Sequence, residues 1–434
     1  MNLKNITTLF SEANCNKLYA KPLADNDNSK NQVYFGPGFE ALNLFPNAGI
    51  VPDSSPKNPI FKAKLQFGWL QTNGSVVEAP RAQLILYPQY PEVRFSGFLQ
   101  GCSAPPSELM TKRQAGRILF LGVTEHRQIF GFVVASDSST AREFQAHESE
   151  PTAGVFHELA LPHAVSESAS RKKLLFELHR INQLGWIDSK QLDSSGILKP
   201  CTAAQCGGYT LEAELGIPKN SSVDPDFLGW EVKQHSVSNF NRMQAGTITL
   251  MTPEPTGGFY KERGVEAFIR KFGYPDQRGR TDRLNFGGIH RIGERHHNTH
   301  LTLMLNGYDA MRKRITDTDG NLALVNDRGV IAASWAFSGL LQHWSHKHTK
   351  AAYVPSQCRK EPAWQYHYGD KVRLGQRTDS LRLLHALAQG VVYYDPGIKL
   401  ENASGKPIIK RRSQFRIASK SIESLYETME SVEV

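Results

Sequence analysis

The feature that most constrains this chain is the stretch 207–233, GGYTLEAELGIPKNSSVDPDFLGWEVK, in which acids and a lysine recur at a defined spacing. Asp226 precedes Glu231 by five positions, and Lys233 follows two positions later. Because alternate side chains of a strand share a face, Glu231 and Lys233 point the same way. The apolar residues between them predict buried strands, and buried carboxylates need a positive partner. The spacing therefore predicts a divalent-cation site at Asp226 and Glu231, with Lys233 beside it.

A helix is predicted just before this cluster. The residues TLEAELGI fit a helix, and Thr210 is a residue type that opens one. Glu212 then lies in the first turn, from which it reaches the same cation. A lysine beside the cation orients a water or neutralises charge on a phosphate, so the set suits metal-dependent phosphodiester hydrolysis. The competing interpretation is a hairpin edge with a surface ion pair, which stabilises little.

These residues resemble the MvaI/BcnI family of restriction endonucleases, which is related to the MutH-type nicking nucleases. GGYTLEAELGI and PDFLGWEVK carry the resemblance. It implies an α/β, MutH-like PD-(D/E)xK nuclease fold with a mixed central sheet. It assigns Glu212, Asp226, Glu231 and Lys233 to the active centre. It also implies Mg²⁺ as the cofactor, with the Val232 carbonyl as a further ligand.

A second resemblance to MutH-type nucleases lies in WSHKHTKAAYVP, residues 344–355. That segment resembles one that carries an additional active-site lysine, and Lys347 is the matching position. A cation there would bind the scissile or a neighbouring phosphate. The alternative is that Lys347 and Lys350 are solvated charges at a helix end.

Composition narrows the class of protein. The 434 residues are enough for two domains, and 40% hydrophobic and 21% charged residues are typical of a globular chain. No apolar run approaches the roughly 20 residues that span a bilayer, and the N-terminal residues lack an export pattern. We therefore expect a cytoplasmic protein. The five cysteines are scattered without a CxxC pair, which predicts free thiols rather than a zinc site.

Positive charge is concentrated in one part of the chain. The net charge is +9, and residues 341–420 alone carry 15 Lys and Arg against 5 Asp and Glu. Such clustering predicts contacts with phosphates, and the expected partner is double-stranded DNA. Histidines and arginines gather at 290–300, where a loop that reads phosphates or base edges is favoured over a zinc site or plain surface polarity. The predicted DNA-binding residues are Arg81, Arg94, Arg291, Arg295, His296, His297, Lys371, Arg373, Arg377, Lys410, Arg411, Arg412 and Arg416, and Arg117 is a further candidate.

Residues 1–145 are predicted to form a β-rich domain, because LILYPQY, EVRFSGFL, RILFLGVT and QIFGFVVA are short apolar or alternating runs. KPLADNDNSKNQVYFGP resembles the start of B3-like DNA-binding pseudobarrels; binding of a protein or of the nuclease domain is the alternative. Residues 146–165 are predicted to be a linker. The endonuclease domain, 166–434, is predicted to open with an amphipathic helix at 171–187. Its catalytic lobe is expected at about 166–280 and 330–356, with a DNA-recognition lobe in the remainder.

The expected protein is thus a Mg²⁺-dependent, type II-like restriction endonuclease, active in restriction-modification and phage defence. The resemblance implies a monomer that cuts at a short, CC…GG-type pseudopalindromic site, leaves 5′-phosphate and 3′-hydroxyl ends, and works beside a cognate methyltransferase. The alternatives are a nicking or phage-defence endonuclease controlled by its N-terminal domain or a partner, and a catalytically inert DNA-binding regulator.

Overall fold

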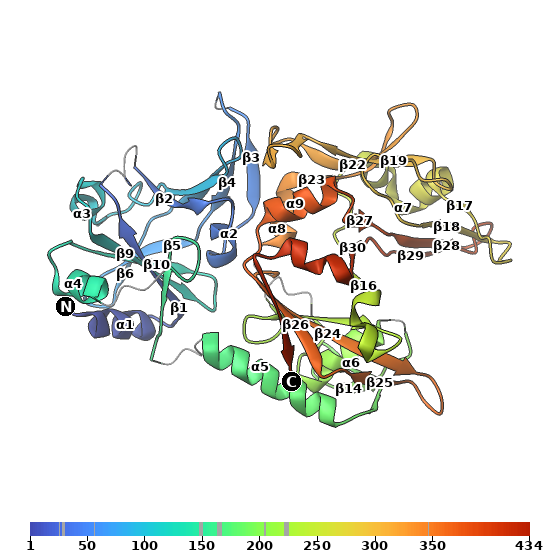
Figure 1. The fold of residues 1–434 in the computed structure, drawn as a ribbon. Coiled ribbons are helices and arrows are strands. Elements are labelled where there is room, and N and C mark those ends of the chain that lie inside the picture. The colour runs from blue at the N-terminus through green and yellow to red at the C-terminus, as the bar shows by residue number, and fades with distance from the viewer. Residues whose placement is uncertain are drawn as a thin grey trace. The chain divides into compact units, whose positions relative to one another are not determined.

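The computed structural model describes residues 1–25, 27, 31–55, 57–146, 151–162, 167–203, 205–220, 225–345 and 347–434. The chain divides into two compact units, Met1–Lys173 and Leu174–Val434. The first is mostly strand and the second mixes strands with helices, so the predicted fold class is confirmed. Each unit is described by itself (Figure 1).

Two sheets make up unit 1. The first has the order β11-β1-β9-β10-β5-β6, and the second has the order β2-β8-β7-β4-β3. All of the pairs are antiparallel except β10 with β5. The four apolar runs expected to be strands form β7, β8, β9 and β10. The bounds are β1 Cys15–Leu23, β2 Gln32–Pro37, β3 Ile50–Asp53, β4 Ile60–Lys64, β5 Phe67–Leu70, β6 Val76–Glu78, β7 Gln83–Tyr87, β8 Glu92–Ser96, β9 Arg117–Thr124, β10 Ile129–Val134 and β11 His157–Leu159.

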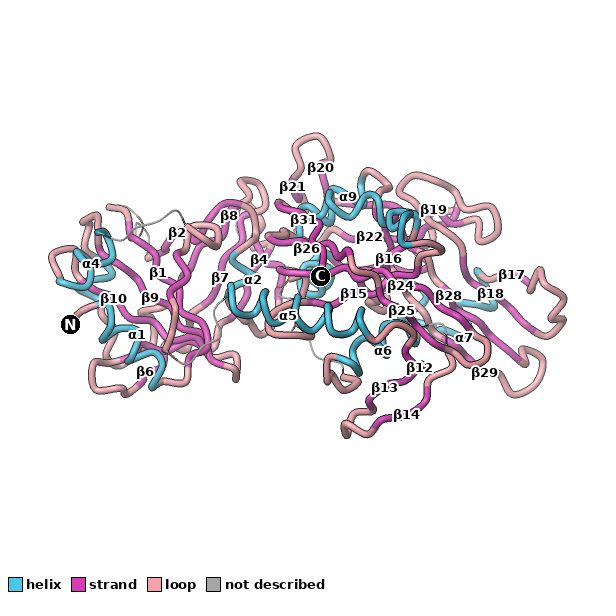
Figure 2. The backbone as a smooth tube through the Cα atoms, turned by 60° about the horizontal axis from the view of Figure 1, so that its bottom comes forward, coloured by secondary structure: helices cyan, strands magenta, loops and turns pink. Residues whose placement is uncertain are grey.

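Strand β9 is buried along its whole length, because both of its faces are covered. Ile118 and Phe120 pack in a cluster with α1 and α4, while Leu119 and Leu121 alternate to the opposite face. A cluster of aromatic rings joins the two sheets; Phe67 of β5 and Phe95 of β8, for instance, meet edge to face at 5.0 Å. Figure 2 shows the helices of this unit as short pieces around the strands. They are α1 Leu3–Glu12, α2 Ala41–Leu44, α3 Ser107–Thr111 and α4 Ser139–Ala146.

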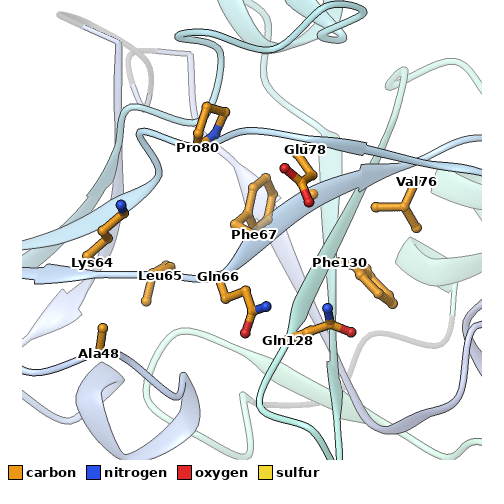
Figure 3. A pocket seen from close by; sticks show the side chains of 11 residues that line it. Ala48, Lys64, Leu65, Gln66, Phe67, Val76, Glu78, Pro80, Gln128 and Phe130 are labelled. Atoms are coloured by element: carbon orange, nitrogen blue, oxygen red, sulfur yellow. The ribbon is translucent and has the colours of Figure 1, made fainter.

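Unit 1 also holds a pocket of about 470 Å³ beside β5 (Figure 3). Phe67 and Phe130 give it two aromatic walls, and Gln66, Glu78 and Gln128 add polar groups. None of the predicted site residues lines it.

The segment predicted to be a linker contributes a strand to unit 1. Within 146–165, β11 pairs with β1 through contacts such as Tyr19 with Glu158. Residues 147–150 and 163–166 of that segment lie outside the described residues. Helix α5, Glu167–Gln183, follows and matches the predicted amphipathic helix. The helix ends before Leu184, which lies inside the predicted range and is 51% exposed.

The sheet at the centre of the site belongs to unit 2 and has the order β12-β25-β24-β26-β31, with β15 parallel to β24. Helices α5 and α6 lie with this sheet (Figure 1), and Leu178, Leu211, Val232 and Val354 share one buried cluster. The predicted bounds of the catalytic lobe leave out β25, β26 and β31, which this sheet includes. The bounds are α6 Cys206–Glu214, β12 Ile187–Asp188, β15 Glu231–Ser236, β24 Lys350–Arg359, β25 Gln365–Tyr368, β26 Lys371–Gln376 and β31 Thr428–Glu433.

The rest of unit 2 is made of small sheets with the orders β13-β14, β16-β30-β27, β17-β18-β28-β29, β19-β22-β23 and β20-β21. Their strands are β13 Lys190–Leu192, β14 Leu198–Pro200, β16 Thr247–Met251, β17 Tyr274–Pro275, β18 Arg283–Gly287, β19 Leu301–Asn306, β20 Tyr308–Asp309, β21 Arg314–Ile315, β22 Asn321–Asn326, β23 Ile331–Ala336, β27 Val392–Tyr394, β28 Gly397–Glu401, β29 Ile408–Lys410 and β30 Phe415–Ala418. The helices are α7 Gly258–Phe272, α8 Phe337–Trp344 and α9 Ser380–Ala388, with 3-10 turns η1 Phe240–Ala245 and η2 Ser419–Leu425. In the described ranges, no helix combines the length and apolar character needed to cross a membrane.

Candidate active site

A tight turn brings the separated acids together. Phe227 and Trp230 exchange two backbone hydrogen bonds of 2.9 and 2.8 Å around Leu228 and Gly229. Both central residues have positive φ, 47° and 85°, as a two-residue hairpin turn requires. Asp226 therefore folds back beside the start of β15 instead of ending a strand of its own.

Strand β15 separates the core from the site. Val232 packs in the buried cluster under α5 and α6, so its neighbours Glu231 and Lys233 point to the opposite face. The backbone N–H of Val232 donates to Oδ2 of Asp226 at 3.2 Å. Because the N–H and C=O of one strand residue lie on the same edge, the Val232 carbonyl also faces the edge of β15 where Asp226 lies.

Four charged side chains converge there. Lys233 forms an ion pair with Oε1 of Glu231. Lys347, far away in sequence, places its Nζ 3.7 Å from Oδ1 of Asp226 and 3.6 Å from Oε2 of Glu231. Glu231 is only 1% exposed, and its Oε2 has no hydrogen-bond partner among the described residues. The structure thus brings together Asp226, Glu231, Lys233 and Lys347.

The electrostatics show an excess of negative charge. Burial, with the repulsion of Glu231, raises the pKa of Asp226 from 3.8 to about 6. Burial and Asp226 raise the pKa of Glu212 from 4.5 to about 7, so Glu212 lies within electrostatic range of the same group. Burial lowers the pKa of Lys233, but the adjacent Glu231 and Asp226 outweigh it, and the net pKa is raised. The neighbouring carboxylates thus favour the protonated form of Lys233.

Helix α6 carries Glu212 but begins at Cys206, so the prediction that Thr210 opens it was wrong. The Thr210 hydroxyl is buried and bonds the backbone of Lys190 at 3.1 Å, and it is not available as a cap. Glu212 consequently lies near the helix end, not in its first turn. Gly207 lets the helix approach the sheet, since a Cβ there would lie 2.9 Å from the Gln234 side chain.

A hydrogen bond and a disulfide hold the start of α6 in place. The Tyr368 hydroxyl donates to the Gly207 carbonyl at 2.7 Å. Cys201 and Cys206 form a disulfide, so the expectation of free thiols was wrong for these two. The positions of the cysteines in the sequence could not show this pairing, because it depends on how the chain after β14 places Cys201 beside the start of α6. Cys15, Cys102 and Cys358 are free.

The backbone near Lys347 is anchored by His348. Its ring stacks on Trp344 at 4.2 Å, and its Nε2 lies 3.0 Å from the Leu250 carbonyl. Burial lowers the pKa of His348 to about 3, so the ring is neutral. His346, within the same motif, lies outside the described residues. The lysine thus extends from a fixed backbone position and is not a solvated charge.

The predicted DNA-binding residues fall into three groups by exposure. The exposed ones are Arg81, Arg295, His297, Lys371, Lys410, Arg411 and Arg412. The half-buried ones are Arg94, Arg291, Arg377 and Arg416. Several are already ion-paired, Arg94 with Glu92, Arg295 with Asp327, Arg377 with Glu427, Lys410 with Glu401 and Arg416 with Asp395.

Three cationic or histidine candidates are buried instead. Arg373 donates to the carbonyl and hydroxyl of Ser419, so it fixes η2 to the sheet. The Arg117 guanidinium donates to three backbone carbonyls inside unit 1. His296 accepts from the Thr299 backbone and stacks on His290, so it shapes its loop from within. As they lie in the structure, their side chains are not presented to DNA.

Lys399, which was not among the predicted DNA-binding residues, belongs to a cationic strand surface together with the predicted Lys410. In the sheet β17-β18-β28-β29, Phe286, Ile398 and Leu400 are buried, and α7 contacts β18 and β28. The alternate residues point outward, where Lys399 pairs in register with Lys410. Burial and the cations Arg283, Arg412 and Lys410 lower the pKa of Lys399. The alternation Ile-Lys-Leu-Glu in β28 is the sequence signal that would have predicted this face.

The described residues hold no cluster of three or more His, Cys, Asp or Glu arranged as a ready metal site. The donors at the edge of β15 still fit a small hard cation. Mg²⁺ is bound in proteins by one or two carboxylates with water and substrate phosphate completing its shell. Asp226 and Glu231 supply that pair, and Oε2 of buried Glu231 accepts no hydrogen bond from the described residues, its positive neighbour Lys347 lying 3.6 Å away.

Buried acids paired with lysines, in a unit that also carries a cationic strand surface, are typical of a hydrolase with a polyanionic substrate. The chain belongs to the MvaI/BcnI restriction endonuclease family, whose model matches residues 175–426. It is therefore a site-specific deoxyribonuclease. Six solved chains match it. One is restriction endonuclease MvaI in complex with its cognate DNA substrate, with 18% identity, a TM-score of 0.45, and coverage of 61% of this chain and 99% of that one. Another is MvaI without DNA, with 17% identity, a TM-score of 0.33, and coverage of 62% and 99%. No curated protein matches the chain.

Proposed function

We propose that this enzyme is a Mg²⁺-dependent, type II-like restriction endonuclease of the PD-(D/E)xK kind. It cleaves duplex DNA at a short, CC…GG-type pseudopalindromic site and leaves 5′-phosphate and 3′-hydroxyl ends. The observation that carries the proposal is the convergence of Asp226, Glu231, Lys233 and Lys347 at one sheet edge. It acts in the cytoplasm as a monomer, with a cognate methyltransferase protecting host DNA, in restriction-modification and phage defence.

Asp226 and Glu231 would hold the cation, with the Val232 carbonyl and Glu212 completing the protein ligands. The carbonyl faces the same edge as the Asp226 carboxylate, as the hydrogen bond from the Val232 N–H indicates. When bound, Mg²⁺ neutralises charge on the scissile phosphate and makes a water a better nucleophile.

The remaining chemistry belongs to the lysines. Lys233 stays protonated beneath its carboxylate neighbours and donates to the attacking water or to the phosphate oxygen that gains charge. Lys347, 27% exposed at the rim, contacts a phosphate. Glu231 orients Lys233 through their ion pair, which fixes where the donor points.

The outward face of β18, β28 and β29 would contact DNA phosphates. Lys399 and Lys410 are directly opposed like charges, which destabilise a sheet; Glu401 pairs with Lys410, and a DNA phosphate would offset the remaining positive charge. Exposed Arg411 and Arg412 follow β29 and extend the positive surface. Arg295 and His297 are further candidates on the loop before β19.

Unit 1 would serve as a second DNA-binding module of the B3-like type. Its two strand-rich sheets and the exposed Arg81 support this. Arg94, half-buried and paired with Glu92 at 2.7 Å, is the weaker of the two predicted contacts.

The test is cleavage of a random duplex DNA library by the full chain in Mg²⁺, followed by sequencing of the ends. We expect one short motif with 5′-phosphate ends on both strands. Nicked plasmid without linear product would instead identify a nicking enzyme. Absence of any cleavage on unmodified and modified DNA would refute the proposal and favour a DNA-binding regulator.

A further inference from the structure

Lys347 lies where a cation would bind. Its Nζ is close to one oxygen of Asp226, at 3.7 Å, and one of Glu231, at 3.6 Å. These are the two acids proposed to hold Mg²⁺. The contacts are longer than a charge-assisted hydrogen bond of about 2.8 Å, so the ammonium bridges the acids without bonding tightly to either.

The two lysines differ in how firmly they are held. Lys233 is two residues from Glu231 on the same strand and pairs directly with Oε1. Lys347 reaches across from the loop before β24 and lies nearest to Oε2, the oxygen without a hydrogen-bond partner among the described residues. Of the two lysines, Lys347 has the longer contacts with the carboxylates that would hold the metal.

The charges at the site also bear on metal binding. Glu212, Asp226 and Glu231 bring three negative charges when ionised, against two positive charges from Lys233 and Lys347. If Lys347 did not move, a divalent cation and the Lys347 ammonium would contact the same two carboxylates and repel each other. A phosphate from DNA supplies the negative charge that Lys347 then lacks.

We propose that Lys347 is a built-in stand-in for the divalent cation: it bridges Asp226 and Glu231 in the metal-free enzyme and moves to a DNA phosphate when metal binds. The inference rests on the proposed function, because it takes those acids as the metal ligands. His348 holds the backbone, so the movement is confined to the lysine side chain.

The movement of Lys347 couples metal binding to DNA binding. Without DNA, Lys347 competes with the cation and weakens its binding; with DNA, the phosphate attracts the ammonium and the acids are released. Because such coupling is reciprocal, metal must also tighten DNA binding. The enzyme is thereby kept from holding an active metal before its substrate is present.

The experiment is calorimetric titration of Mn²⁺ and Ca²⁺ into the full-length protein without DNA. Lys347→Met should bind about tenfold more tightly than wild type, which corresponds to about 1.4 kcal/mol. Lys347→Gln should do the same if the first variant folds poorly. Lys420→Met, which removes an exposed lysine of the same unit, should bind as wild type does. Equal or weaker binding by both Lys347 variants would overturn the inference.

A second measurement needs no variant. Amine labelling of wild-type protein, read by mass spectrometry, should increase at Lys347 when Ca²⁺ is added and stay constant at Lys420. Unchanged labelling of Lys347 at saturating Ca²⁺ contradicts the inference. Asp226→Asn distinguishes a failure of the proposed metal site from a failure of the Lys347 inference. If Asp226→Asn binds metal as wild type does, the proposed metal site is wrong. If it abolishes metal binding while Lys347→Met does not tighten it, only the stand-in role of Lys347 fails.

Discussion

The isosteric substitution Asp226→Asn should make the metal-free protein more stable. Asp226 is 13% exposed, and burial with Glu231 raises its pKa from 3.8 to about 6. Above pH 6 the folded protein therefore holds a charge that is easier to carry in the unfolded chain. The difference corresponds to about 3 kcal/mol of lost stability, at 1.36 kcal/mol per pKa unit.

The direction of the Asp226 pKa shift determines the pH range in which this residue affects stability. Between pH 3.8 and about 6 Asp226 is more protonated in the folded state than in the unfolded state, so its contribution to the free energy of unfolding falls as pH rises and is constant above. Asparagine carries no charge and its carbonyl can still accept from the Val232 N–H. The variant should consequently gain stability at pH 8 and lose that advantage toward pH 4.

The assay is urea unfolding in EDTA at pH 8 and pH 4.5, followed by tryptophan fluorescence. Asp193→Asn is the matched control, because Lys199 lowers the pKa of Asp193 and its removal should not stabilise. Mg²⁺ should raise the urea midpoint of wild type more than that of Asp226→Asn. A lower midpoint for Asp226→Asn than for wild type at pH 8 would refute the reasoning.

Three further predictions concern other parts of unit 2. Replacing Lys399 and Lys410 by Gln should weaken DNA binding and reduce the slope of log affinity against log salt by about 0.9 for each phosphate that the variant no longer neutralises, measured by fluorescence anisotropy; an unchanged slope argues against DNA binding by this face. Burial lowers the pKa of His290 to about 3, so below pH 6.5 the unfolded chain gains a proton that the folded protein does not. The free energy of unfolding should therefore fall by about 1.4 kcal/mol for each pH unit of acidification through this residue. His290→Gln should make the urea midpoint depend less on pH between pH 7 and 5, and parallel profiles for variant and wild type would contradict this. Reduction of Cys201–Cys206 should lower the free energy of unfolding by about 2 kcal/mol, and an equal urea midpoint with and without reductant would count against it.

The parts of the site set by local geometry were predictable from sequence. Strand alternation places Glu231 and Lys233 on one face, and the short spacing to Asp226 leaves room only for a tight turn. Lys347 depends on the parallel pairing of β15 with β24, in which Glu231 faces Ala351. No local rule fixes a contact over that sequence separation; only the motif resemblance indicated it.

The errors share a physical origin, because long-range contacts override local preference. Thr210 has the chemistry of a helix cap, but Lys190 captures its hydroxyl. Arginine is usually exposed, yet Arg117 and Arg373 are buried because backbone carbonyls satisfy their guanidinium groups. A long-range contact also brings the C-terminal strand β31 into the central sheet, where it pairs with β26.

The most direct test of the catalytic assignment is single-turnover cleavage of duplex DNA by Lys233→Met, with DNA binding measured in Ca²⁺. Loss of a preorganised donor at the reacting phosphate should slow cleavage at least about a hundredfold while binding stays near wild type. Cleavage by Lys233→Met at the wild-type rate would contradict the assignment of this site.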